Sequence, residues 1–185
     1  QETVGTTLGG KTLGLIGLGK LGSRMAKIGN AFGMSVIAWS QNLTEERAAE
    51  NGAKAVSKEA LFQTSDAISI HVPYSARSKG LVGEAEISSM KAGAILVNTS
   101  RGPIVDEWPL LSALKSGKIR AGLDVYDTEP LPSDHPLRTL PNVVLTPHIG
   151  FVTEGAYRAF FQDTVENIKA WDAGSPIRIM EGPPK

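Results

Sequence analysis

Three glycines spaced as G-x-G-x-x-G follow a short apolar run near the start of the sequence, in TLGLIGLGKLG at residues 12–22. The apolar run predicts a buried strand, and the pattern after the glycines predicts a helix. Gly17 permits the tight turn between them, Gly19 lets a phosphate approach the backbone, and Gly22 lets the helix pack closely on the strand. Backbone amides and the helix dipole would then face a pyrophosphate. The alternative is a plain strand-to-helix turn with no ligand. Features elsewhere in the sequence are needed to choose between a phosphate-binding turn and a plain one.

Short aliphatic or β-branched runs alternate with amphipathic segments along the chain. Strands are predicted at residues 12–16, 35–39, 67–72, 94–99, 121–125 and 143–146, and helices at 20–32, 44–51, 58–64, 84–90, 106–116 and 153–173. Ser57 and Asp106 stand where helix N-caps are expected, as does Thr44, although Arg47 leaves its capping box imperfect. The alternation predicts an α/β fold with a doubly wound parallel sheet, the Rossmann type, which favours the dinucleotide interpretation of the glycines.

The overall composition excludes several classes of partner. Nineteen basic and nineteen acidic residues balance to a formal net charge of zero, and no run of Lys or Arg could follow a nucleic-acid backbone. No apolar stretch approaches the roughly 18 residues of a membrane span. The sequence contains no cysteine, which excludes a zinc–cysteine site and fits a reducing compartment. We expect a soluble cytoplasmic protein with no nucleic-acid partner, no membrane contact and no metal site.

The residues after the second predicted strand bear on the choice of cofactor. A dinucleotide fingerprint usually carries an acid about 20 residues after the glycines, where it binds the ribose hydroxyls of NAD. This sequence has Ser40, Gln41 and Asn42 instead. Nothing there repels the 2′-phosphate of NADP, and no arginine in the loop attracts it. The cofactor is therefore expected to be NAD or NADP, with the choice left open.

Four charged or titratable side chains follow predicted strands in ILVNTSRGPIVDEWPLLSAL, AGLDVYDTEPLP and VVLTPHIGFVT. They are Arg101, Asp124, Glu129 and His148. Ligands of doubly wound sheets bind at the carboxyl edge, so these residues are expected to share one crevice. Each alone has a structural explanation, such as a turn cap or a solvated surface residue, and their joint appearance favours a site.

The remaining histidines and the tryptophans receive structural assignments. His71 is expected to line the cofactor cleft and His135 to lie in a loop. Trp39, Trp108 and Trp171 are assigned to packing.

Together with GLGKLG and SIHVPYSARSKGLVG, these stretches resemble the D-isomer-specific 2-hydroxyacid dehydrogenases over residues 8–171. The resemblance implies that Arg101, Glu129 and His148 form the catalytic set. It also implies that Asp124 holds the nicotinamide carboxamide, that Val72 and Pro73 line the adenine pocket, and that Ser40 takes the place of the ribose acid. The full set of expected cofactor-binding residues is Gly17, Gly19, Lys20, Leu21, Gly22, Ser40, Val72, Pro73, Ser78, Thr99, Asp124 and Gly150.

These residue types suit the reduction of a 2-oxo acid by a nicotinamide cofactor. His148 can supply the proton for the developing alkoxide, Glu129 would orient its ring, and the guanidinium of Arg101 can bind the substrate carboxylate. The sequence therefore predicts an oxidoreductase acting on a small acid such as glyoxylate or hydroxypyruvate. A nucleotide-sensing module without turnover is the alternative.

The resemblance also bears on domain organisation. It divides the sequence into a dinucleotide-binding domain at residues 1–150 and a helix and tail at residues 151–185 that return to a substrate domain. Most of that substrate domain is expected to be absent from this chain, which alone would be inactive. A homodimer formed through the dinucleotide-binding domain is expected.

Overall fold

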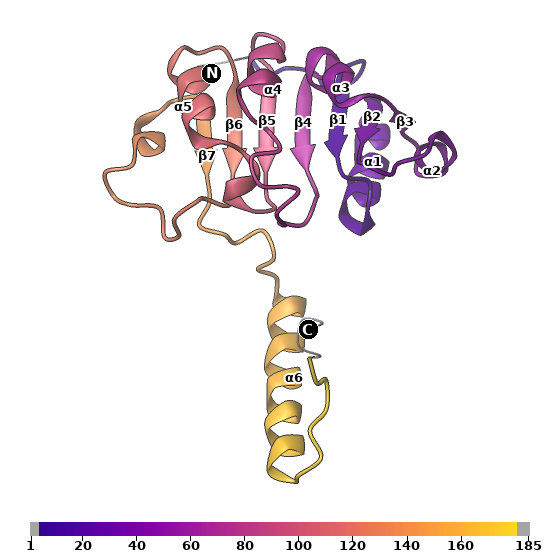
Figure 1. Ribbon diagram of the computed structural model, residues 1–185, viewed down its shortest axis with the longest axis vertical. Coiled ribbons are helices and arrows are strands. Elements are labelled where there is room, and N and C mark those ends of the chain that lie inside the picture. The colour runs from indigo at the N-terminus through magenta and orange to yellow at the C-terminus, as the bar shows by residue number, and fades with distance from the viewer. Residues whose placement is uncertain (1–3, 181–185) are drawn as a thin grey trace. The chain divides into compact units, whose positions relative to one another are not determined.

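Parallel strands form one seven-stranded sheet in the computed structural model, which describes residues 4–180 (Figure 1). The strands are β1 (Thr12–Ile16), β2 (Ser35–Trp39), β3 (Lys54–Ala55), β4 (Ala67–Ile70), β5 (Ile95–Asn98), β6 (Arg120–Leu123) and β7 (Val143–Leu145). Their order across the sheet is β3-β2-β1-β4-β5-β6-β7. The strand order therefore reverses between β1 and β4, and the carboxyl ends of all strands lie at one edge.

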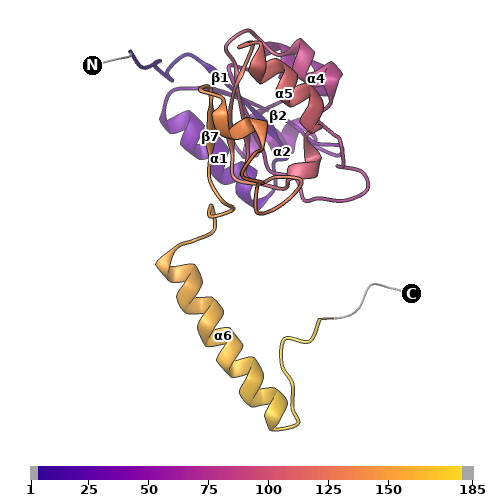
Figure 2. The same ribbon diagram turned by 90° about the vertical axis from the view of Figure 1, so that its left-hand side faces the viewer.

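Helices cover both faces of this sheet. They are α1 (Lys20–Ala31), α2 (Glu45–Glu50), α3 (Lys58–Thr64), α4 (Glu84–Ser89) and α5 (Glu107–Lys115), with 3-10 turns at Gly102–Ile104 and Pro136–Thr139. Helix α1 lies on one side of the sheet, and α4 and α5 lie together on the other (Figure 2). Right-handed crossovers between parallel strands require this division, because the direction of the strand order changes at β1.

The period-two pattern of β1 divides the core into two layers. Leu13 and Leu15 point into one apolar cluster, and Ile16 points into the other. Gly14 faces the same cluster as Ile16. Leu61 of that cluster packs so closely on Gly14 that a Cβ there would lie 2.9 Å from Cδ2 of Leu61. Strands buried on both faces are typical of parallel sheets, which explains the nearly continuous apolar runs in the sequence.

The α/β fold predicted from the sequence is confirmed, and every predicted strand and helix is present with ends that differ by at most two residues. The strand β3 was not predicted, because a strand of two residues, Lys54 and Ala55, is too short to show a recognisable hydrophobic pattern. Thr44 and Ser57 cap their helices as expected. The prediction for Asp106 was wrong: its side chain makes no capping hydrogen bond and lies instead against Gly80, where a Cβ would be 2.9 Å from Oδ1.

Only one of the three tryptophans packs as predicted. Trp39 packs against the larger apolar cluster, and the ammonium of Lys58 lies 5.9 Å from the centre of its ring. Trp108 is 73% exposed because it occupies the outer side of α5, opposite the buried Leu110 and Leu114. Trp171 is also 73% exposed. The packing assignments of Trp108 and Trp171 were therefore wrong for the described part of the chain.

Residues Ile149–Lys185 form a second unit by their contacts, while Gln1–His148 form the first. The second unit contains α6 (Glu154–Asp172), whose N-terminus is capped by the hydroxyl of Thr153. In the tail, Arg178 forms ion pairs with Asp163 and Glu166 at 2.9 and 2.7 Å. The large apolar side chains of α6 are exposed, namely Tyr157, Phe160, Phe161, Val165, Ile168 and Trp171.

Among residues 4–180, no helix has both the length and the apolar content that crossing a bilayer requires.

Candidate active site

The glycine turn joins β1 to α1 at the point where the strand order reverses. Gly17 has a φ of +95°, which only glycine adopts without strain, and its N–H donates to the carbonyl of Trp39 at 2.8 Å. A Cβ at Gly22 would overlap the carbonyl oxygen of Gly17. No heavy atom lies within 4 Å of a Cβ built on Gly19. The turn therefore needs Gly17 and Gly22 for its own packing, whereas the side of Gly19 is open to a ligand.

The ends of β2 and β4 flank this turn. The N–H of His71 donates to the carbonyl of Ile16 at 2.8 Å, and Cγ1 of Val72 would lie 2.8 Å from a Cβ on Gly17. Ser40, which follows Trp39 directly, lies beside Gly17 through the hydrogen bond of that turn. The structure thus brings Gly17, Ser40 and Val72 together, and the exposed Lys20 and Leu21 begin α1 next to them. Such a cradle of small residues at a helix N-terminus fits a dinucleotide pyrophosphate.

Ser78, an expected cofactor-binding residue, lies in the loop that follows β4. Its residue is 7% exposed, and its hydroxyl donates to the carbonyl of Pro73 at 2.8 Å while accepting the N–H of Ser75 at 2.7 Å. The hydroxyl of Ser78 therefore holds the loop after β4 in shape. Ser75, which sequence reasoning did not single out, is an exposed residue of this loop, and its hydroxyl lies 3.3 Å from that of Ser78.

At the ends of β5, β6 and β7 the structure brings together three of the four predicted side chains. Nδ1 of His148 lies 2.7 Å from Oε2 of Glu129, and the charge of Arg101 is near enough to affect the same carboxylate. Partial burial acts to raise the pKa of Glu129, but it is outweighed by hydrogen bonds from His148 and from the Tyr126 N–H and by the charges of His148 and Arg101. The net pKa of Glu129 is lowered, which keeps it ionised beside the imidazole.

His148 has an unusual backbone conformation, with a φ of +56°. A non-glycine residue in this left-handed region costs about 1–3 kcal/mol, and such residues concentrate at functional sites. Its N–H donates to the carbonyl of Thr146 at 3.1 Å, across Pro147. The side chain of His148 is thus directed toward Glu129 by a strained turn that directly follows β7.

Asp124 occupies the buried end of β6. It is 5% exposed, and Oδ1 accepts a hydrogen bond from the hydroxyl of Thr146 at 2.5 Å. Sequence reasoning missed Thr146, although its place two residues before His148 in the same stretch was a usable signal. Thr99, after β5, is exposed at the same edge of the sheet, and Gly150 belongs to the second unit.

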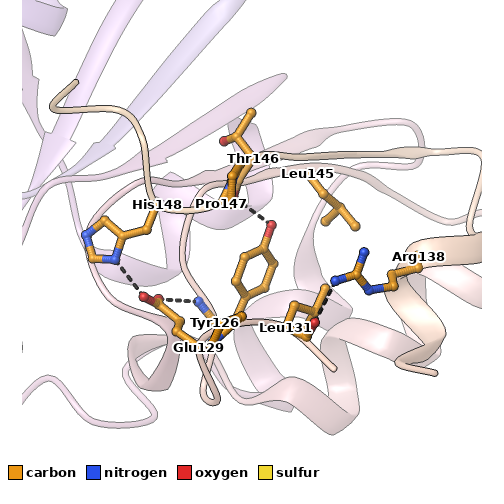
Figure 3. A pocket seen from close by; sticks show the side chains of 9 residues that line it. Tyr126, Glu129, Leu131, Arg138, Leu145, Thr146, Pro147 and His148 are labelled. Carbon is orange, nitrogen blue, oxygen red and sulfur yellow. Dashed lines mark hydrogen bonds and ion pairs between the residues drawn. The ribbon is translucent and has the colours of Figure 1, made fainter. Parts of the chain in front are cut away.

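A cavity of about 500 Å³ opens beside the His148 and Glu129 pair (Figure 3). Its lining is formed by Tyr126, Glu129, Pro130, Leu131, Arg138, Leu145, Thr146, Pro147 and His148. The guanidinium of Arg138 is held by the carbonyls of Leu131 and Pro132 at 2.6 and 2.7 Å. No pattern in the sequence pointed to Arg138, because it lies in the irregular segment between β6 and β7.

The other two histidines lie apart from this pair. Nε2 of His71 lies 2.9 Å from the hydroxyl of Ser69, and burial lowers the pKa of His71. Nδ1 of His135 accepts the N–H of Leu137 at the start of a 3-10 turn, and its Nε2 lies 3.3 Å from Glu107. His135 thus belongs to the loop where it was expected.

A family profile and several curated relatives match this chain. A profile described as D-isomer specific 2-hydroxyacid dehydrogenase, NAD binding domain, matches residues 1–150. The glyoxylate reductase of Aeropyrum pernix is 45% identical over 172 residues, which are 92% of this chain and 51% of that enzyme. The D-3-phosphoglycerate dehydrogenase of Archaeoglobus fulgidus is 43% identical over 179 residues, 96% of this chain and 34% of the relative. The chain thus spans about half or less of the length of these curated relatives.

Solved structures show the same fold. The phosphoglycerate oxidoreductase of Vibrio cholerae superimposes with a TM-score of 0.88 at 36% identity, over 93% of this chain and 56% of that one. The D-lactate dehydrogenase of Aquifex aeolicus, solved with NAD and lactic acid, gives a TM-score of 0.80 at 36% identity, over 95% and 57% of the two chains.

Proposed function

The chain belongs to the D-isomer-specific 2-hydroxyacid dehydrogenase family, and on that premise we propose that it carries the cofactor-binding half of an enzyme that interconverts small 2-oxo acids and D-2-hydroxy acids. Glyoxylate and hydroxypyruvate are the proposed substrate class, because relatives named glyoxylate reductase and hydroxypyruvate reductase match most of this chain. The observation that carries the proposal is the ion pair of His148 and Glu129 at the edge of the sheet that also bears the glycine turn.

Each residue of the proposed site has a chemical role in the reduction. A nicotinamide cofactor would supply the hydride, and the turn that Gly17 and Gly22 shape would hold its pyrophosphate on the open side of Gly19. The guanidinium of Arg101 would bind the substrate carboxylate through paired donors and polarise the oxo group. Nε2 of His148 would deliver a proton to the forming alkoxide, while Glu129, 2.7 Å from Nδ1, would hold the orientation of the ring. In the oxidation, His148 accepts that proton.

We propose that the protein discriminates only weakly between NAD and NADP. Ser40 lies at the end of β2 without a carboxylate, so no charge there repels a 2′-phosphate. Asp124, held by Thr146, would bind the nicotinamide carboxamide, and Val72 and Pro73 would line the adenine pocket. None of these contacts distinguishes the two cofactors.

A homodimer formed through the first unit completes the proposal. Trp108 and Pro109 line a shallow cavity of about 190 Å³ with Glu84 and Ser88, and an exposed indole of this kind is typical of an interface. The sequence contains no cysteine, which supports action in the reducing cytoplasm.

The deciding assay follows the loss of NADH or NADPH absorbance with a panel of 2-oxo acids, using the protein in its natural full length. Consumption with glyoxylate or hydroxypyruvate is expected. If calorimetry shows that both cofactors bind but no 2-oxo acid causes NADH or NADPH to be consumed, the protein acts as a nucleotide-sensing module and not as an enzyme. The 185-residue chain alone is expected to bind NADH without turnover, because one side of the substrate would remain open to water.

A further inference from the structure

The hydroxyl of Tyr126 lies where the ends of β6 and β7 meet. The residue is 8% exposed, and its hydroxyl is 3.0 Å from the carbonyl of Leu123 and 2.9 Å from the carbonyl of Thr146. Burial, and then the charge of Asp124, raise the pKa of Tyr126, so its hydroxyl stays protonated and acts as a donor. One proton is therefore shared between the last carbonyl of β6 and the first carbonyl beyond β7.

These two carbonyls also support the turn that carries His148. The N–H of Thr146 donates to Leu123 at 3.0 Å, and the N–H of His148 donates to the carbonyl of Thr146 at 3.1 Å. The hydroxyl of Tyr126 thus fixes the acceptor on which the left-handed backbone of His148 depends.

The backbone of Tyr126 acts on the other member of the pair. Its N–H donates to Oε1 of Glu129 at 2.9 Å, which leaves Oε2 for Nδ1 of His148 at 2.7 Å. Figure 3 shows Glu129 between His148 and the backbone nitrogen of Tyr126, and the hydroxyl of Tyr126 directed toward Thr146 and Pro147. A single residue therefore contacts the supports of both His148 and Glu129.

We infer that Tyr126 is a positioning residue for the proposed reaction, and that its hydroxyl holds His148 in line with Glu129 through the carbonyl of Thr146. The inference rests on the proposed function for its catalytic consequence. The structural part of the inference, the effect of Tyr126 on the His148 ring, does not depend on the proposed function. A hydroxyl that served only the fold would change stability and leave the ring where it is.

The test is Tyr126→Phe, which keeps the buried ring and removes the hydroxyl. In the full-length protein kcat is expected to fall about tenfold, because small displacements of an acid or base cost rate steeply. KM for the 2-oxo acid and the dissociation constant for NADH are expected to stay within about twofold, since the hydroxyl that is removed bonds the carbonyls of Leu123 and Thr146 and is not among the groups proposed to bind either ligand. Tyr157→Phe, the same change at a half-exposed residue of α6, is the matched control.

A second readout does not depend on activity. The 185-residue chain contains three histidines, His71, His135 and His148, whose imidazole signals are to be compared by nuclear magnetic resonance. In the wild type the proton between Nδ1 of His148 and Glu129 is expected far downfield, and in Tyr126→Phe it is expected to move upfield or broaden. The ring of His135, whose Nδ1 accepts a hydrogen bond from the N–H of Leu137, serves as the internal reference.

The outcomes separate the two proposals. An unchanged His148 signal overturns the positioning role, whether or not kcat falls, because Tyr126 would then act by another route. A changed signal with unchanged kcat overturns the catalytic part of the inference. A wild-type protein that consumes no cofactor overturns the proposed function, while the comparison of the imidazole signals still decides the position of His148.

Discussion

Nδ1 of His148 lies 2.7 Å from Oε2 of Glu129, although the two residues are 19 positions apart in the sequence. The carboxylate is kept ionised by the lowered pKa of Glu129. Because the carboxylate is ionised, Nδ1 donates its proton to it, and in the proposed mechanism Nε2 is the nitrogen that exchanges a proton with the substrate. The pair is therefore suited to general acid and base catalysis.

His148→Asn tests this role in the full-length protein. Because asparagine cannot deliver the proton, kcat is expected to fall by about 10²–10⁴-fold, the usual share of a general acid. The dissociation constant for NADH, measured by fluorescence titration, is expected to stay nearly unchanged. A variant with near-normal kcat would remove His148 from the mechanism.

Arg101→Lys examines the grip on the substrate carboxylate. Arg101 begins a 3-10 turn after β5, and its Nη1 donates to the carbonyl of Ser100 at 2.6 Å. A lysine keeps the charge and loses the planar pair of donors, so KM for the 2-oxo acid is expected to rise by about tenfold, equivalent to about 1.4 kcal/mol. Steady-state kinetics over a wide range of acid concentrations measures this. Unchanged KM and kcat would place Arg101 away from the substrate.

Two alanine substitutions in the glycine turn separate ligand binding from packing. A Cβ at Gly19, whose φ of −83° any residue adopts, would stand in open space. Gly19→Ala is expected to change the free energy of unfolding by less than about 1 kcal/mol. It is expected to weaken NADH binding about tenfold, because the methyl occupies the space proposed for the phosphate.

Gly22→Ala is the contrasting variant. Its Cβ would overlap the backbone carbonyl of Gly17, so the free energy of unfolding is expected to fall by about 1–3 kcal/mol. Chemical denaturation and calorimetry with NADH measure both quantities. If Gly19→Ala bound NADH as the wild type does, the turn would serve the fold alone.

The sequence was sufficient for the sheet, because short and nearly continuous apolar runs such as that of β1 indicate strands buried on both faces. It was also sufficient to gather His148, Glu129 and Arg101, since the carboxyl ends of parallel strands share an edge. The outcome for Trp108 differed because a large apolar residue can stand on the exposed side of a helix, so its residue type alone does not show that it is covered. Thr146 and Tyr126 escaped notice because their roles come from hydrogen bonds between strand ends that only the folded chain brings together.

Ser40→Asp tests the proposed weak cofactor selectivity. Ser40 follows the carbonyl of Trp39 that accepts the N–H of Gly17, so a carboxylate there would lie beside the dinucleotide turn. Repulsion of a 2′-phosphate is expected to shift the ratio of dissociation constants toward NADH by about tenfold or more, at about 1.4 kcal/mol per factor of ten. Fluorescence titrations with NADH and NADPH measure the ratio, and Ser40→Asn is the neutral control. A ratio that does not move would mean that Ser40 is not at the ribose.

His71 predicts how stability depends on pH. Burial lowers the pKa of His71 from its ordinary value of 6.5, and its Nε2 lies 2.9 Å from the hydroxyl of Ser69. The unfolded chain therefore takes up the proton at a higher pH than the folded chain, so the free energy of unfolding falls as pH is lowered through 6.5. One proton gives a slope of at most about 1.4 kcal/mol per pH unit, and partial exposure of the ring to water keeps the slope below that limit. Urea denaturation of the 185-residue chain between about pH 5 and 7 measures the slope, above the ordinary pKa values of carboxylates. His71→Gln is expected to flatten it, because glutamine keeps a polar group near Ser69 and cannot be protonated. An equal slope in both proteins would show that another group is responsible.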